Sequence, residues 1–325
     1  MLEKFELSVE VVNPKNNLPL RKKDGVLIDA DGNQFPVFKE IPRFVGANYA
    51  ENFGFQWKQF RTTQIDNEKL SLSKERFFGE TQWRPDELDG QDILEVGSGA
   101  GRFTRVILDN TRATLSSVDY SEAVDANIEN NGSIDRERLK LFQASVYELP
   151  FPDNSFDKVV CLGVLQHTPD FEASVKALIA KAKPGGEIVV DFYRIKGWWT
   201  KVHSKYLLRI ISKRIPHDRL LSLIERNIDW LVKAFDRLNK EGLGALTRFL
   251  PIADLRGFPT TLSPCERREW AILDTFDMLS ARYDQPQRIQ HVARMFERHG
   301  SKVTFAGTQA FEGGSATVVR ATKVS

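Results

Sequence analysis

Residues 93–103, ILEVGSGAGRF, decide the fold that this sequence predicts. The stretch begins as an apolar strand, passes Glu95 and glycines at 97, 99 and 101, and leaves as the start of a helix. Glycines remove the side chains that would keep a ligand away from the backbone N–H groups of a helix N-terminus. We therefore expect a strand-to-helix turn that holds a ligand.

Around this turn, predicted strands alternate with predicted helices. The strands are DILEVG, LSSVD, KLFQASV, DKVVCLGVL and GEIVVDFY, and the helices span 101–110, 121–130, 170–182 and 286–299. Such alternation is typical of a parallel sheet with helices on both faces. Two last strands, KVTFAGT and ATVVRATKV, predict an antiparallel hairpin. The sequence thus predicts an α/β, doubly wound, Rossmann-like fold with a seven-stranded, mostly parallel sheet.

Composition divides the chain into five segments. We expect a small β-hairpin module over 1–45, an aromatic helical lead-in or lid over 46–88, the ligand-binding core over 89–194, a helical cap inserted after the fifth strand over 195–270, and the rest of the core over 271–325. The hairpin in the first segment is placed by the turn residues Asp31-Gly32-Asn33.

Composition also excludes several classes of protein. The 325 residues carry a net charge of +2, which argues against a nucleic-acid partner, and two cysteines cannot form a disulfide framework or a four-thiolate zinc site. No apolar run reaches the roughly 18 residues that a membrane span needs, and the first residues lack a secretion signal. We expect a cytoplasmic protein without a membrane span, for which peripheral membrane contact stays open.

The glycine pattern separates two kinds of cofactor. A dinucleotide fingerprint starting at Gly97 needs a third glycine at 102, where the sequence has Arg102. The carboxylate of Glu95, separated from the first glycine by one apolar residue, suits a cationic ligand better than a pyrophosphate. Nicotinamide chemistry is therefore disfavoured.

Glu95-Val-Gly-Ser-Gly-Ala-Gly101 resembles motif I of class I S-adenosylmethionine-dependent methyltransferases, and the resemblance extends over 90–194, including Lys183-Pro184-Gly185-Gly186. It implies S-adenosylmethionine as cofactor. The implied cofactor-binding residues are Glu95, Gly97, Ser98, Gly99, Gly101, Arg102, Asp119, Tyr120, Ser145, Val146, Leu162, Gln166 and His167.

Two of these positions carry the recognition of the nucleoside. The resemblance implies that Asp119, about 20 residues after the glycines, accepts the ribose hydroxyls. The alternative is a carboxylate that caps the next helix, although Ser121 is available for that role. Ser145 stands where many relatives have an aspartate for the adenine amino group, so Val146 and the Tyr147 ring are candidate substitutes.

A hydroxyl acceptor needs a base, and three residues are candidate catalytic groups. His167 follows the fourth strand and could be the base, or it could bond a loop carbonyl or contact the cofactor. Tyr193, after the fifth strand, either meets the acceptor or packs as an aromatic ring. Asp274 and Asp277, at i and i+3 in LDTFDMLSARYDQP, either bind sugar hydroxyls or belong to an exposed turn. No histidine lies at ligand spacing, so no metal is expected.

Two further stretches are similar to relatives from surface-polysaccharide gene clusters. Residues 48–66, NYAENFGFQWKQFRTTQID, predict a lid helix over the cofactor, with Gln56, Trp57 and Arg61 as candidate contacts. Residues 27–45 resemble a zinc-ribbon-like module that here has no cysteines. This module should act as scaffold or as partner surface.

The start of the cap is basic. Between Arg194 and Arg219 there are eight lysines and arginines against Asp218, and Lys201, Lys205, Arg209 and Lys213 recur on one helix face. This helix is either a solvated face over a packed stripe, an anion site, or a surface for membrane or nucleic acid.

The expected function is transfer of a methyl group by in-line displacement to a small-molecule acceptor, a hydroxyl of a sugar or glycan precursor in polysaccharide biosynthesis. Nucleotide-linked and lipid-linked sugars, which carry phosphate, are included. The rivals are a small-molecule or lipid/quinone methyltransferase, a non-catalytic cofactor-binding protein, and a nicotinamide oxidoreductase. The oligomeric state does not follow from the sequence.

Overall fold

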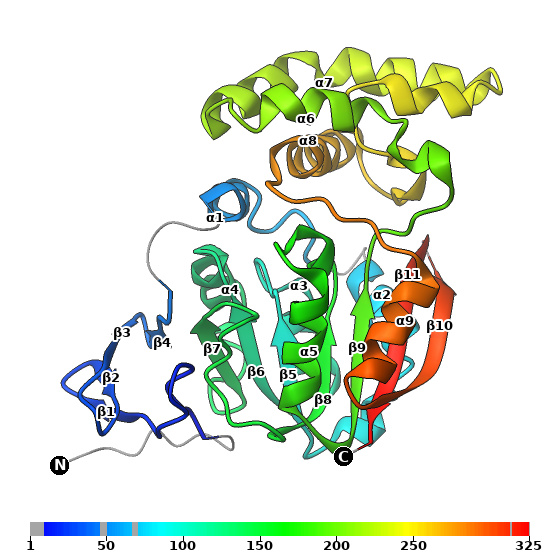
Figure 1. The fold of residues 1–325 in the computed structure, drawn as a ribbon. Coiled ribbons are helices and arrows are strands. Elements are labelled where there is room, and N and C mark those ends of the chain that lie inside the picture. Colours follow the sequence, from blue (N-terminus) through cyan, green and yellow to red (C-terminus); the bar gives the residue numbers. More distant parts are fainter. Residues whose placement is uncertain (1–9, 46–50, 67–70, 313, 325) are drawn as a thin grey trace.

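The computed structural model describes residues 10–45, 51–66, 71–312 and 314–324. Residues 1–9 of the expected N-terminal module lie outside the described residues, as do 46–50 and 67–70 of the expected lead-in. Figure 1 shows a sheet domain with a small β module at one side and a layer of helices above one end of the sheet.

The main sheet has seven strands in the order β10-β11-β9-β8-β5-β6-β7. The strands are β5 (Asp92–Val96), β6 (Thr114–Asp119), β7 (Leu139–Gln143), β8 (Phe156–Cys161), β9 (Ala182–Asp191), β10 (Ser301–Phe311) and β11 (Gly314–Lys323). Strands β5 to β9 pair in parallel, and β11 pairs antiparallel with both β9 and β10. The predicted α/β fold with its C-terminal hairpin is confirmed.

Helices cover both faces of this sheet. They are α2 (Leu72–Thr81), α3 (Arg102–Asn110), α4 (Ala123–Asn131), α5 (Phe171–Lys181) and α9 (Ile289–Arg298). Helices α5 and α9 bury Val175, Leu178 and Phe296 in one core cluster, whereas α2 and α3 bury Phe77 and Ile107 in the other. Strands β5, β6 and β7 follow one another toward one edge of the sheet, whereas β8 and β9 follow toward the other edge. Such a switch between β5 and β8 places a ligand crevice beyond the carboxyl ends of these central strands.

The N-terminal module is a four-stranded antiparallel sheet: β1 (Arg21–Lys23), β2 (Val26–Ile28), β3 (Gln34–Phe38) and β4 (Ile41–Pro42). Asp29, at the β2–β3 turn, accepts hydrogen bonds from the side chains of Asn13 (2.6 Å), Asn33 (2.8 Å) and Asn16 (3.1 Å). Burial alone would raise the pKa of Asp29, but these hydrogen bonds lower it well below its ordinary value. A hydrogen-bonded carboxylate thus ties together the turn of this cysteine-free module.

The module is joined to the free edge of the main sheet. Arg43 forms a bridge with Gln143 of β7, and its guanidinium lies 2.8 Å from Asp125 of α4. Leu27 and Phe44 are buried in the same cluster as the sheet residues. The module therefore shares the core of the sheet domain.

The helical layer contains α1 (Glu51–Gln59), α6 (Ser204–Ser212), α7 (His217–Lys240) and α8 (Pro264–Ser280), with short 3-10 helices at Trp198–Lys201, Gly244–Phe249 and Leu255–Gly257. Two further 3-10 turns, Pro85–Leu88 and Leu165–His167, belong to the sheet domain. Helix α7 buries Leu220, Ile228 and Leu231 against Phe276 and Leu279 of α8. We call α6, α7 and α8 the cap.

The boundary expected between residues 270 and 271 falls inside α8. A capping box between Ser263 and Glu266, with Pro264 in the first turn, starts this helix, and it runs without interruption to Ser280. Residues 271–280 consequently lie in the cap, and the exposed turn expected around Asp274 and Asp277 is a partly buried helix face. None of the helices in the described ranges is both long and apolar enough to span a bilayer.

Candidate functional site

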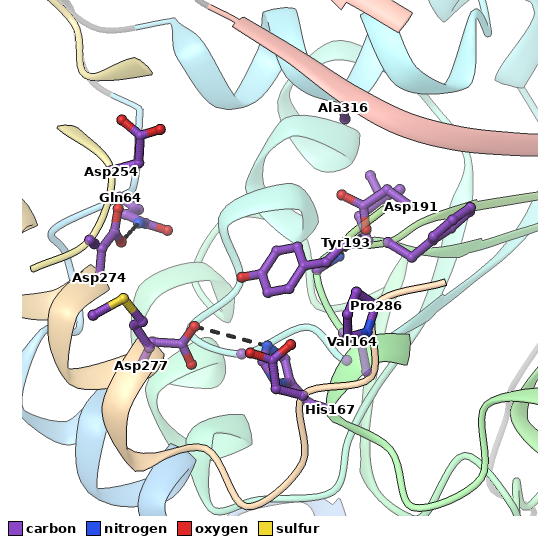
Figure 2. Close-up of a pocket in the computed structure, with 18 of the residues that line it drawn as sticks. Gln64, Val164, His167, Asp191, Tyr193, Asp254, Asp274, Asp277, Pro286 and Ala316 are labelled. Carbon is purple, nitrogen blue, oxygen red and sulfur yellow. Dashed lines mark hydrogen bonds and ion pairs between the residues drawn. The ribbon is translucent and has the colours of Figure 1, made fainter. Parts of the chain in front are cut away.

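A cavity of about 1120 Å³ lies between the carboxyl ends of β5, β6, β8 and β9 and the helices above them. Its walls come from the glycine turn, the ends of the strands, α1 and the cap. The volume slightly exceeds the usual range of small-molecule sites, which run to about 1,000 Å³, so there is room for a cofactor and an acceptor. Figure 2 shows the part of the cavity where His167, Tyr193 and Asp277 converge.

The glycines of the turn serve different purposes. Gly97 has φ +83°, and a Cβ there would lie 2.1 Å from Val164 in the loop after β8. Gly101 has φ +88°, and a Cβ there would lie 2.2 Å from side-chain atoms of Asn127 and Asn131 on α4. Gly97 and Gly99 line the cavity. Gly101 does not line it, and its missing side chain permits the close packing of α3 on α4.

Asp119 ends β6 and lines the cavity. One carboxylate oxygen accepts the N–H of Gly99 (2.8 Å), and the other accepts the N–H (2.8 Å) and hydroxyl (2.6 Å) of Ser121. Ser121 Oγ in turn accepts the N–H of Ala123, the first residue of α4, whose N-cap position is Glu122. Burial raises the pKa of Asp119, while these hydrogen bonds oppose the rise. The carboxylate is thereby fixed beside the glycine turn.

Glu95 is not a ligand-facing group. Its side chain is 3% exposed, lies outside the cavity lining, and accepts hydrogen bonds from the hydroxyls of Thr104 (2.5 Å) and Ser117 (2.8 Å). Burial raises its pKa to about 7. Because successive residues of a strand face opposite sides of the sheet, position 95 points into the layer between β5 and α3 and away from the cavity.

The remaining predicted cofactor residues divide in the same way. Ser98, Arg102, Tyr120, Ser145, Val146, Leu162 and His167 line the cavity. Gln166 does not: it is 1% exposed, and its backbone carbonyl accepts the N–H of Gln285. Its position in the first 3-10 turn after β8 directs it into the core, while the next residue, His167, faces the cavity.

Two buried polar atoms on the cavity wall suit a polar cofactor. Ser98 Oγ and Gln56 Oε1 are buried and have no hydrogen-bond partner within the described ranges. Unpaired buried polar atoms are rare and usually mark a missing ligand or water. With the open glycine turn and Asp119, these atoms fit a nucleoside cofactor.

His167 is held in one orientation by its surroundings. Its Nδ1 lies 3.0 Å from the carbonyl oxygen of Tyr283, and its Nε2 lies 3.9 Å from Oδ2 of Asp277 (Figure 2). The rings of Phe53 and Tyr193 flank the imidazole, with centroids 5.6 and 5.8 Å away. Because a carbonyl oxygen only accepts, Nδ1 carries a proton, and Nε2 is the ring nitrogen that faces Asp277.

The cap brings carboxylates to this histidine. Asp274 and Asp277 lie on α8, and Gln64 donates to Asp274 at 3.2 Å. Burial, followed by the neighbouring Asp277, raises the pKa of Asp274 to about 7. Tyr193 stands inside the cavity opposite both carboxylates, and its removal from bulk water together with Asp277 raises the pKa of its hydroxyl well above the ordinary value. All three predicted catalytic residues therefore line one cavity.

An arginine and two carboxylates form a buried network that the sequence analysis missed. Arg76 of α2 lies 2.6 Å from both Glu80 and Asp191, and Asp191 also accepts the N–H of Gly163. Burial raises the pKa of Glu80 to about 7. Asp191 could have been found, because it ends the fifth strand at the ligand edge of a parallel sheet. Nothing in the sequence around Arg76 indicates its position.

Two cations of the basic segment turn inward. Lys205 Nζ lies 2.7 Å from Asp284, and Arg209, 6% exposed, donates to the carbonyls of Met278 and Ala281 at the end of α8. These two residues are therefore neither on a solvated face nor free to bind an anion, because they neutralise Asp284 and cap α8.

Part of the chain that forms this site matches a known protein family. Residues 94–190 match the family described as "Methyltransferase domain". The match covers the glycine turn, Asp119 and His167. This stretch is a methyltransferase domain.

Two relatives and one solved structure illustrate the likeness. A tRNA U34 carboxymethyltransferase of Nautilia profundicola is 31% identical over 34% of this chain and 37% of its own. A demethylmenaquinone methyltransferase of Tropheryma whipplei is 28% identical over 40% of this chain and 54% of its own. The structure of a magnesium protoporphyrin IX methyltransferase from Synechocystis with bound SAH has a TM-score of 0.43 and 13% identity, covering 86% of this chain and 89% of that one. This chain thus spans about half or less of the two relatives.

Proposed function

We propose that this chain transfers a methyl group from S-adenosylmethionine to a hydroxyl of a small-molecule acceptor. One observation carries the proposal: the ring nitrogen Nε2 of His167 faces Asp277 inside a cavity that also contains the glycine turn and Asp119. When bound, S-adenosylmethionine supplies a methyl group on a sulfonium centre, which is open to in-line attack.

The cofactor is bound by residues of the cavity wall beneath the cap. Asp119 accepts the two ribose hydroxyls, and such charge-assisted hydrogen bonds contribute about 1.5–3 kcal/mol each. Ser98 and Gln56 supply the polar atoms that otherwise lack partners. Trp57, which lies against Gly99, supplies an aromatic wall.

His167 is proposed as the general base. Its Nε2 takes the proton of the acceptor hydroxyl as the oxygen forms its new bond to carbon. The carboxylate of Asp277 stabilises the imidazolium that results, and the Tyr283 carbonyl keeps the other nitrogen protonated. A positioned base of this kind contributes about 10²- to 10⁴-fold in rate. Phe53 and Tyr193 keep the ring from rotating away.

The acceptor is proposed to be a sugar or related glycan precursor. Asp274 and Asp277 offer carboxylates to neighbouring hydroxyls on the acceptor side of the cavity. Farther from the glycine turn, the same cavity is lined by Lys196, Arg248 and Arg256, which suit the phosphate of a nucleotide- or lipid-linked sugar. With such an acceptor, the protein would act in the cytoplasm and take part in polysaccharide biosynthesis.

An apolar small-molecule or quinone-like acceptor is the second candidate. The name of the Tropheryma whipplei relative favours it, as do the aromatic side chains Phe53, Trp57 and Tyr193 around the cavity. A protein that binds the cofactor without turnover would keep Asp119 functional and make His167 dispensable.

The test begins with a calorimetric titration of S-adenosylhomocysteine and, in the same buffer, of NAD. Micromolar binding of the first and none of the second is expected. Turnover is then followed as release of S-adenosylhomocysteine with panels of nucleotide sugars, polyprenyl-phosphate sugars and quinols, with His167→Gln as control. Activity on sugars that is lost in His167→Gln supports the proposal, activity on quinols supports the second candidate, and binding without turnover on any panel points to the non-catalytic protein.

A further inference from the structure

Helix α6 (Ser204–Ser212) is amphipathic, but its polar side chains face the protein and its apolar side chains face outward. On the polar side, Ser204 donates to the Leu250 carbonyl at 2.8 Å and Ser212 to the Leu279 carbonyl at 2.7 Å. Lys205 and Arg209 reach Asp284 and the end of α8, as described above. The polar face of this helix is therefore already satisfied inside the cap.

The apolar side chains of the same helix are left outside. Leu207 is 73% exposed, Ile211 66%, Ile210 59% and Leu208 37%. Positions 207, 210 and 211 share one side of a helix, so these side chains form a continuous surface, which we call the α6 apolar face. The buried cluster of the cap is built instead from α7 and α8. A contiguous exposed apolar surface of this kind marks an interaction site.

The charges around this face are almost all positive. Lys196 precedes the helix, and Lys213, Arg214 and Arg219 follow it, all exposed. Asp218 is the only acidic residue between 194 and 219. An apolar helix face with basic residues at both ends is the pattern that binds the interface of a membrane containing anionic lipids.

We infer that the α6 apolar face docks on an anionic lipid surface, with Leu207, Ile210 and Ile211 inserted at the level of the headgroups. A second copy of this chain fits less well, since antiparallel or parallel pairing of two α6 helices brings basic ends against basic ends. The length of α6 agrees with a helix that lies on the surface and does not cross it.

The segment that leads into α6 forms part of the cavity wall. Val202, two residues before α6, lines the cavity and is 43% exposed, and Lys196 lines it as well. The wall of the cavity therefore continues along the chain into the α6 apolar face. The docking itself does not depend on the proposed methyl transfer, so the two can fail separately.

The test is flotation of the full chain with vesicles of phosphatidylcholine alone and with about 30% phosphatidylglycerol added. The variant Leu207→Gln/Ile211→Gln removes the apolar face. The matched control is Phe38→Gln/Val324→Gln, which replaces two comparably exposed apolar side chains (61% and 66%). Phe38 ends β3 and Val324 directly follows β11 near the C-terminus, and Figure 1 shows both β3 and the C-terminus away from the cap. Because all four side chains are largely exposed, both variants should fold like the parent, which circular dichroism and calorimetric binding of S-adenosylhomocysteine check.

We expect the parent and the control to float with the anionic vesicles, at least tenfold more than with phosphatidylcholine alone, and the α6 variant to lose about tenfold or more of this binding. Raising the ionic strength to about 0.5 M should weaken the binding, because surface charges are then screened. Equal flotation of parent and α6 variant, or no flotation of either, overturns the inference. A dimer in sedimentation velocity that only the α6 variant lacks, without vesicle binding, assigns the face to a second copy and also overturns it.

Discussion

The basic nitrogen of His167 faces a carboxylate from another layer of the molecule: Nε2 lies 3.9 Å from Oδ2 of Asp277. His167 follows β8 of the sheet domain, whereas Asp277 belongs to α8 of the cap. The pair therefore exists only when the cap is seated over the sheet. This arrangement couples closure of the cavity to the assembly of the proposed base.

The first prediction concerns this pair. His167→Gln should lower kcat with the acceptor by about 10²- to 10⁴-fold, since the variant has no basic nitrogen. Asp277→Asn should lower it by about tenfold, because only the stabilisation of the imidazolium is lost. Affinity for S-adenosylhomocysteine, measured by calorimetry, should stay within about threefold in both variants. A large loss of that affinity in His167→Gln would instead mean that the ring contacts the cofactor.

Asp119 gives the second prediction. Asp119→Ala should weaken S-adenosylhomocysteine binding by at least tenfold, because two charge-assisted hydrogen bonds to the ribose are removed. The carboxylate also accepts the N–H of Gly99, so Asp119→Asn is the matched variant that keeps an acceptor for this N–H without the charge. Calorimetry should rank the affinities parent, Asn, Ala. Unchanged affinity in both variants, with the thermal transition preserved, would remove Asp119 from the cofactor site.

What the sequence could predict depends on how local the determining contacts are. Gly97 and Asp119 were found because a strand-to-helix turn and the next strand end lie at fixed spacings along the chain. Glu95 follows the same motif, but its direction depends on which side of β5 faces α3, and that is a tertiary property. Asp277 is a candidate from its spacing to Asp274, but its approach to His167 depends on the packing of α8. Arg76 reaches the cavity only through the packing of α2, and this helix carries no local signal for it.

The basic helix α6 is a second case in which local sequence predicts the helix face but not what this face contacts. Its four-residue repeat places Lys205 and Arg209 on one face, and the periodicity of residues 195–240 predicts helical structure. The sequence alone does not say that this face meets the carbonyl end of α8 and Asp284. The direction in which Lys205 and Arg209 point depends on the groups that can pair with them. For Arg209 these groups are carbonyls at the end of α8, about 70 residues away in the chain.

The third prediction is a pH dependence of stability centred on Glu95. Burial raises its pKa in the folded protein to about 7 from an ordinary value of 4.5. Between these two values the folded state binds more protons than the unfolded state, so the contribution of Glu95 to stability falls as the pH rises through this window. Glu95→Gln removes the titration and can still accept hydrogen bonds from Thr104 and Ser117.

Thermal unfolding of parent and Glu95→Gln at pH 5 and pH 8 measures this effect. The variant should gain stability relative to the parent on going from pH 5 to pH 8, by at most about 3 kcal/mol for a shift of this size. Glu80 and Asp274, whose pKa values also lie at about 7, titrate in both proteins and cancel in the difference. A difference that does not change with pH would show that Glu95 is charged throughout.

The fourth prediction concerns the joint between α6 and α8. Arg209 donates to the carbonyls of Met278 and Ala281 and lies 3.9 Å from Asp284, and it is almost completely buried. Arg209→Met keeps the apolar stem but leaves two helix-terminal carbonyls without this donor and Asp284 with Lys205 as its remaining cation. The free energy of unfolding should fall by about 2–4 kcal/mol.

Urea unfolding followed by far-ultraviolet circular dichroism measures this loss, and Lys213→Met, at the residue directly after the same helix, is the matched control. Lys213 is exposed, so its replacement should change the free energy of unfolding by about 0.5 kcal/mol or less. Because Asp277 precedes the capped end of α8 by one turn, Arg209→Met should also lower turnover while the affinity for S-adenosylhomocysteine stays unchanged. Equal stability of the two variants would mean that the end of α8 is held by its packing on α7 and not by the buried guanidinium.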